Sequence, residues 1–159
     1  MRNKSKSRPD HSKVDWRKVI KDGESFRKFK FFGARFEFSK FTNCDFSSVS
    51  AKRACFIKAD LTGSNFTGAN LEGSNFGGAN LTNVNFKGAI LKQTNFENAI
   101  VEGANFMNAS IKMAKKLNLS DLQILEIEEF KQAEKDRTAA DLAKIKAKKL
   151  RKINSLIKE

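Results

Sequence analysis

Residues 59–88 read ADLTG SNFTG ANLEG SNFGG ANLTN VNFKG, which is six five-residue units in one register. All but one of these units begin with a small residue, the exception being Val84, and each continues with a polar residue and has a large apolar residue, its centre, in third place. The same period extends in both directions, so that eighteen units cover residues 24–113, and only Ala51 among the centres is not bulky. The centres are Phe26, Phe31, Phe36, Phe41, Phe46, Ala51, Phe56, Leu61, Phe66, Leu71, Phe76, Leu81, Phe86, Leu91, Phe96, Val101, Phe106 and Ile111.

A period of five fits neither a helix nor an ordinary strand. A helix turns every 3.6 residues and a strand alternates every two, so steps of five would scatter the centres around a helix and form no buried stripe. A short, unbroken repeat instead indicates a solenoid, in which each unit buries its apolar residues by stacking on neighbouring units.

The motif A-[D/N]-L, at residues 59–61, 69–71 and 79–81, resembles the pentapeptide repeat family. The resemblance implies an all-β solenoid, a right-handed quadrilateral parallel β-helix with four units per coil. Ninety residues would then form about four and a half coils, and a rod roughly 20 Å long at about 4.8 Å between neighbouring strands.

Twenty residues per coil predict four columns of centres inside the rod. One side would stack Phe26, Phe46, Phe66, Phe86 and Phe106, and the opposite side Phe36, Phe56, Phe76 and Phe96. The other two columns would mix Phe31 and Phe41 with smaller aliphatic centres. Rings that point inward cannot touch a ligand, so we interpret these columns as structural.

The ends of the chain depart from this pattern. We expect a disordered basic arm over residues 1–13, an amphipathic helix over 14–23 that caps the first coil, and a helical cap with a basic helical tail over 114–159. Ser120 followed by Gln123 is a capping box at the start of the last segment, which could form one helix or two. The sole histidine, His11, lies in the expected arm, where a rigidly held catalytic role is not expected.

Positive charge is concentrated at the two ends. Residues 1–58 hold 16 Lys and Arg against 6 Asp and Glu, residues 59–113 hold 3 against 4, and residues 114–159 hold 12 against 8. This distribution is typical either of a solvated surface or of an anion-binding patch for nucleic acid, an acidic protein or a membrane surface. The candidate binding residues are Lys28, Lys30, Arg35, Lys40, Lys52, Arg53, Lys58, Lys144, Lys148, Lys149, Arg151 and Lys152. We expect the first seven to form one surface cluster.

No set of residues typical of catalysis, cofactor binding or metal binding is present in the sequence. Cys44 falls on an inward position and Cys55 on an outward one, so we expect neither a disulfide nor a metal site. The polar N-terminus and the lack of a long apolar run predict a cytoplasmic protein without a transmembrane segment.

Three function classes remain to be weighed. We favour a non-enzymatic interaction or scaffold module whose basic ends dock on an anionic partner, such as nucleic acid or a ribonucleoprotein. Contact of the basic C-terminal helix with a membrane surface stays open. The family resemblance also implies two alternatives: a modulator of type II topoisomerases that resembles duplex DNA, or a bacterial effector delivered into host cells. The positive charge argues against DNA mimicry, and the lack of exposed aromatic residues predicts little sequence preference.

Overall fold

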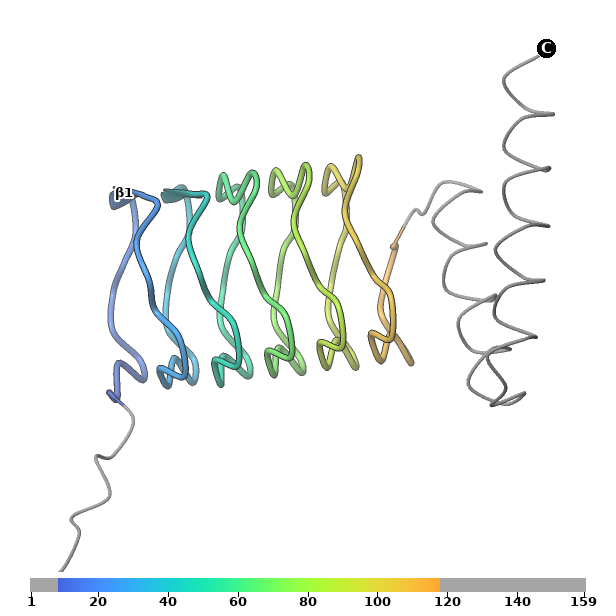
Figure 1. Cartoon of the computed structure of the whole chain (residues 1–159), viewed down its shortest axis with the longest axis horizontal. Coiled ribbons are helices and arrows are strands. Elements are labelled where there is room, and N and C mark those ends of the chain that lie inside the picture. The colour runs from blue at the N-terminus through green and yellow to red at the C-terminus, as the bar shows by residue number, and fades with distance from the viewer. Residues whose placement is uncertain (1–8, 118–159) are drawn as a thin grey trace, which may run out of the picture.

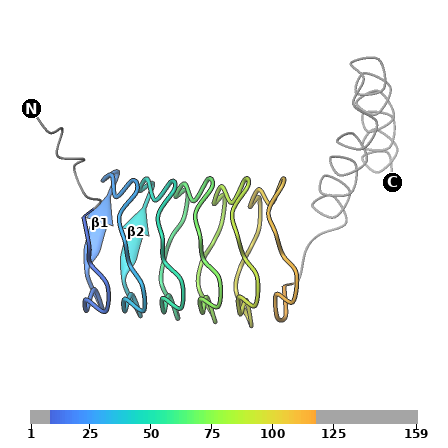
Figure 2. The same ribbon diagram turned by 90° about the horizontal axis from the view of Figure 1, so that it is seen from below.

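The computed structural model describes residues 9–117, which form a rod of stacked coils (Figure 1). Parallel bridges join residues that lie twenty apart in the sequence, for example Asn65 to Asn85 and Asn85 to Asn105. Two runs are long enough to be strands, β1 (Ile20–Asp22) and β2 (Lys40–Thr42); they pair in parallel and lie side by side (Figure 2). The predicted coil of twenty residues is therefore confirmed.

The corners explain why the repeat has five residues. The residue two places after each centre has a positive φ, as in Gly63 (70°), Gly68 (64°) and Asn83 (57°). The next amide then donates to the carbonyl of the centre, with 3.0 Å between Ser64 N and Leu61 O. Glycine and asparagine tolerate this left-handed conformation better than other residues, which accounts for their frequency here. Between two corners, each side of a coil therefore has only about one residue that forms a β-bridge to the neighbouring coil.

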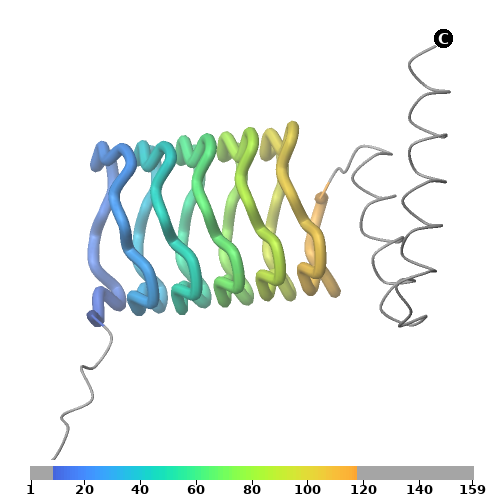
Figure 3. The backbone as a smooth tube through the Cα atoms, viewed as in Figure 1, coloured from blue at the N-terminus to red at the C-terminus, as the bar shows by residue number. Residues whose placement is uncertain are grey.

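Backbone hydrogen bonds between coils run in both directions from each side. The amide of Asn65 donates to Cys44 O in the preceding coil at 2.9 Å, and the amide of Phe66 donates to Asn85 O in the following coil at 2.8 Å. These bonds repeat along the rod and give the regular stack of turns in Figure 3. They do not depend on side-chain identity, so they tolerate wide variation at outward positions.

The predicted columns of phenylalanine are also confirmed. Ring centroids of Phe46 and Phe66 are 4.8 Å apart, and those of Phe56 and Phe76 are 4.7 Å apart, with nearly parallel planes. Rings of the two columns meet edge to face, as between Phe56 and Phe66 at 6.0 Å. Both stacked and edge-to-face arrangements are favourable for aromatic pairs. The small first residues of the units are buried beside the rings.

We name each side of the rod after its first phenylalanine centre, which gives the Phe26, Phe31, Phe36 and Phe41 sides. The coils are numbered from residue 9 in steps of twenty. The first coil is thus 9–28, the second 29–48, the third 49–68 and the fourth 69–88. Within the described residues, the Phe36 side consists of residues 14–18, 34–38, 54–58, 74–78, 94–98 and 114–117. It lies opposite the Phe26 side, because each coil has four sides.

The structure corrects the expectation for the N-terminal segment. Residues 14–23 do not form a helix: Asp15 bridges Arg35, and the amide of Trp16 donates to Arg35 O at 2.7 Å. Trp16 fills a centre and stacks on Phe36 at 6.2 Å between centroids. His11, expected in a disordered arm, fills the preceding centre and stacks on Phe29 at 5.2 Å. The solenoid extends to the N-terminal side because coil-to-coil backbone bonds continue where the side-chain pattern weakens.

At the other end, the ladder continues to a bridge between Asn95 and Lys115, slightly beyond the predicted limit at residue 113. The predicted helical cap, the capping box at Ser120 and the basic tail fall within residues 118–159, outside the described residues.

Candidate anion-binding surface

The seven predicted cations of the first coils are distributed over all four sides rather than in one cluster. Lys28 belongs to the Phe26 side, and Lys40 belongs to the Phe41 side. The Phe31 side contains Lys30, Lys52 and Arg53, and the Phe36 side contains Arg35 and Lys58. The expectation of a single cluster was wrong. It considered only whether each cation points outward, and did not consider on which of the four sides it lies. The predicted residues Lys144, Lys148, Lys149, Arg151 and Lys152 lie outside the described residues.

Three of the seven cations are neutralised by nearby carboxylates. The pairs are Arg35 with Glu37 at 3.1 Å, Lys40 with Asp60 at 3.8 Å and Lys52 with Glu72 at 2.8 Å. The remaining four, Lys28, Lys30, Arg53 and Lys58, have no ion pair within residues 9–117. Lys30 lies near Asp10 and contributes to lowering the pKa of that carboxyl, after the hydrogen bonds from Ser12.

The Phe36 side is bordered by unpaired cations at both of its corners. Lys13 and Arg53 occupy the corner where the chain enters this side, and Lys18 and Lys58 occupy the corner where it leaves. None of these four has an ion pair in the described part of the chain. Lys13 and Lys18 were missed as candidates because they were assigned to the arm and the helix. Continuing the five-residue period toward the N-terminus would have identified them.

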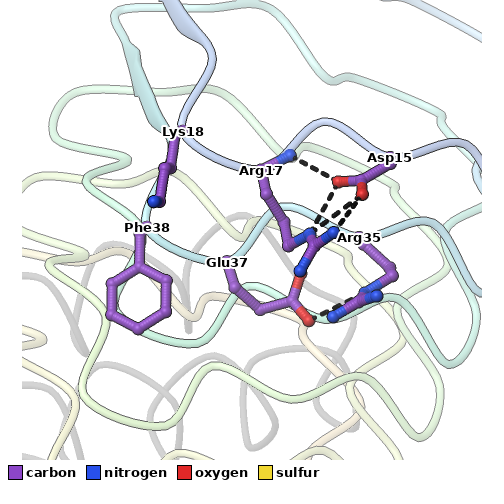
Figure 4. A pocket seen from close by; sticks show the side chains of 6 residues that line it. All are labelled: Asp15, Arg17, Lys18, Arg35, Glu37 and Phe38. Carbon is purple, nitrogen blue, oxygen red and sulfur yellow. Dashed lines mark hydrogen bonds and ion pairs between the residues drawn. The ribbon is translucent and has the colours of Figure 1, made fainter.

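A shallow depression of about 430 Å³ lies at the N-terminal end of this side (Figure 4). On its wall, Arg17 binds Asp15 in bidentate fashion, with Nε 2.9 Å from Oδ1 and Nη2 2.5 Å from Oδ2. These hydrogen bonds from Arg17 lower the pKa of Asp15 to about 2. Arg35 pairs with Glu37 beside them, so the arginines are largely compensated. The uncompensated charge of the depression comes from Lys18, which borders it next to Phe38.

Two aromatic side chains are exposed here, contrary to the expectation that none would be. Phe38 is 56% exposed and Phe32 is 41% exposed, because both occupy corner positions rather than centres. Lys58 Nζ lies 5.6 Å from the centroid of the Phe38 ring, in a cation–π contact. Phe32 lines a second shallow depression, of about 370 Å³, together with Arg53 and the paired residues Lys52 and Glu72. Exposed rings and cations thus lie together at both corners of the Phe36 side.

The described residues offer no arrangement suited to metal binding. Within residues 9–117, no group of three or more His, Cys, Asp or Glu side chains could hold a metal ion. Cys44 and Cys55 are free thiols, and burial raises the pKa of both. Over the same range, no helix is long and apolar enough to cross a membrane.

Comparison with known proteins agrees with the geometry. Residues 30–68 and 64–103 match the family model for pentapeptide repeats, with eight copies. A pentapeptide repeat protein from the thylakoid lumen of Arabidopsis thaliana is 28% identical, with a TM-score of 0.60 over 68% of this chain and 73% of that one. No curated protein sequence matches the chain.

Two further solved structures show lower overall similarity. A pentapeptide repeat protein from the cyanobacterium Cyanothece is 28% identical, with a TM-score of 0.32 over 66% of each chain. QnrB1, a plasmid-mediated fluoroquinolone resistance protein, is 17% identical, with a TM-score of 0.41 over 76% of this chain and 82% of that one.

Proposed function

We propose that this chain, which belongs to the pentapeptide repeat family, is a rigid, non-enzymatic interaction module whose Phe36 side binds an anionic partner such as nucleic acid or a ribonucleoprotein. Members of the family form right-handed quadrilateral β-helices, so the stacked coils supply a stiff support with fixed corners. Interaction with a partner is the role that a filled rod can perform through its surface, since its interior is occupied by side chains.

The observation that carries the proposal is the placement of basic residues at left-handed corners. Lys13, Lys18, Arg53 and Lys58 have φ values between 53° and 59°. This conformation costs a residue with a Cβ about 1–2 kcal/mol, whereas glycine adopts it freely. Glycine does occupy the equivalent corners of the fourth coil, for example Gly73 and Gly78. Four of the five unpaired cations at left-handed corners of residues 9–117 thus border one side of the rod, the fifth being Lys28, and this concentration on one side supports a binding role.

The overall charge distribution supports the same conclusion. Residues 9–58 hold 12 Lys and Arg against 6 Asp and Glu, while residues 59–117 hold 5 against 4. The sign of this charge is opposite to that of duplex DNA, so the alternative of a DNA-mimicking topoisomerase modulator is disfavoured. A cytoplasmic location, docking through the basic tail and delivery into host cells stay predictions.

Substitution by asparagine tests the proposal without disturbing the corners. Asparagine is accepted at corners of this same rod, including Asn43 and Asn83, so Lys58→Asn removes the charge and retains the backbone conformation. Lys28→Asn is the matched control, because Lys28 is also an unpaired corner lysine, at φ 62°, but follows the opposite Phe26 side.

The probes are labelled duplex DNA, labelled single-stranded DNA and poly-glutamate, titrated into the full chain at several salt concentrations. We expect binding at low salt, and each lost phosphate contact should lower the slope of log affinity against log salt by about 0.9 for duplex or about 0.7 for single strands. Lys58→Asn should lower the slope and Lys28→Asn should not. Absence of binding to every anionic probe, or equal effects of the two variants, would refute the proposal.

A further inference from the structure

We infer that the anionic partner is a single-stranded nucleic acid, with Phe38 and Phe32 stacking on unpaired bases while the corner cations hold the phosphates. This inference rests on the proposed function and specifies its ligand. Proteins that bind single strands combine a positively charged track with aromatic side chains on which bases stack. The Phe36 side has both elements at fixed positions.

Phe38 stands out because of its backbone conformation. It has a φ of 59°, and it is the only aromatic residue in a left-handed corner among residues 9–117. The fold imposes this conformation on every corner, and a bulky side chain is among the least suited to it. Burial does not explain the residue, since more than half of the side chain is exposed. The ring is therefore presented to the surroundings at a cost in backbone energy.

The two lysines of the same corner lie on either side of this ring along the rod. Lys18 precedes Phe38 by one coil and Lys58 follows it by one coil, which places their backbones about 10 Å apart at about 4.8 Å per coil. The cation–π contact with Lys58, 5.6 Å from the ring centroid, favours one orientation of the ring. A base stacked on Phe38 would have cations within reach of the phosphates before and after it.

The other corner repeats this combination less completely. Phe32 lines the depression that also contains Arg53, and Arg53 has no ion pair within residues 9–117. The acidic residue of this depression, Glu72, is paired with Lys52 at 2.8 Å. At the corner where the chain leaves the Phe36 side, Glu37 is likewise paired with Arg35. Repulsion between a phosphate chain and these carboxylates is thereby reduced.

Corner glycines of the fourth coil make room for the two cations of the third coil. The Cγ atoms of Arg53 and Lys58 lie 3.6 and 3.4 Å from the positions that a Cβ would take at Gly73 and Gly78. A larger residue at either corner would therefore crowd the side chains of Arg53 and Lys58.

Single strands fit this surface better than duplexes do. In a duplex the bases are stacked inside, and their edges are read by a helix or ribbon that enters a groove. The flat side of a rod can touch only the phosphates of a duplex, which would leave Phe38 and Phe32 without a role. An acidic protein surface would likewise use the cations alone.

The test compares affinities of the full chain for a fluorescein-labelled oligothymidylate of about 12 nucleotides, a duplex of equal length and poly-glutamate, by anisotropy at low salt. Phe38→Asn removes the ring and retains a residue that the corner accepts. We expect it to weaken oligothymidylate binding about 5- to 140-fold, equivalent to ~1–3 kcal/mol at about 1.4 kcal/mol per tenfold. Binding of the duplex and of poly-glutamate should barely change.

Two control variants make the result specific. Ile100→Asn removes a similarly exposed apolar side chain, 53% exposed, from the Phe41 side and should leave the affinity unchanged. Phe38→Trp keeps an aromatic face and should retain binding. If Phe38→Asn weakens all three probes equally or none of them, the inference is wrong, while the proposed function survives provided that Lys58→Asn still weakens anion binding. If no probe binds the parent chain, both fail.

Discussion

Truncation of one core ring should destabilise the rod strongly. Phe76 is fully buried, and its centroid lies 4.7 Å from that of Phe56 and 5.5 Å from that of Phe96. Phe76→Ala removes the buried ring, leaves a cavity and interrupts the column, which together cost about 3–5 kcal/mol. Phe32→Ala makes the same chemical change at a side chain that is 41% exposed and has no positive φ. Phe32→Ala should lower the free energy of unfolding by about 1 kcal/mol, because folding buries less of the Phe32 side chain than of the Phe76 side chain.

Urea unfolding followed by circular dichroism measures the difference. For an m-value of about 1.5 kcal/mol/M, Phe76→Ala should lower the midpoint by roughly 2–3 M and Phe32→Ala by less than about 1 M. A lower m-value for Phe76→Ala would indicate that the rod opens locally at the damaged coil, as is expected for a structure with nearest-neighbour contacts. Equal midpoint shifts for the two variants would refute the assignment of inward and outward positions.

Three further predictions concern hydrogen bonding, backbone conformation and pH. Ser64→Ala should cost about 1–2 kcal/mol in urea unfolding, because the buried hydroxyl donates to Phe41 O at 2.6 Å; full stability would contradict this role. Gly88→Ala should cost about 1 kcal/mol from its φ of 66° alone, since no atom lies within 4 Å of the added methyl group; a stabilised variant would argue against that conformation. Arg17 lowers the pKa of Asp15 from 3.8 to about 2, so its ionised form stabilises the folded chain above pH 3.8 and this contribution is lost as the pH falls toward 2. Asp15→Asn should flatten the pH dependence of stability in that window.

The core of the fold could be predicted from the sequence because its period is strict. With twenty residues per coil, the spacing of Phe46, Phe66 and Phe86 specifies a column directly, without knowledge of backbone geometry. The first coil was harder to predict, because His11 and Lys21 stand at positions where apolar centres are expected. Its backbone bonds to the second coil do not require a particular side chain, so the ladder continues although the pattern does not.

The candidate site could be predicted only in part. The five-residue period predicts that the cations point outward. To assign each cation to one of the four sides, the twenty-residue coil must also be used, and the first coil must be recognised as part of the rod. Ion pairing could not be predicted, because it depends on side-chain conformation: Arg35 pairs with Glu37 within its own unit, whereas Lys52 pairs with Glu72 in the next coil. Exposure of Phe38 could have been predicted, since it lies two residues after a centre.

Backbone amide shifts of the chain, recorded by NMR during titration with oligothymidylate, locate the bound strand on the rod. The largest changes should occur at Lys18, Phe38 and Lys58, at one corner of the Phe36 side. The corner glycines that follow the opposite Phe26 side, Gly68 and Gly88, should stay unchanged. Changes of equal size on the two sides, or changes confined to the glycines, would contradict binding by the Phe36 side.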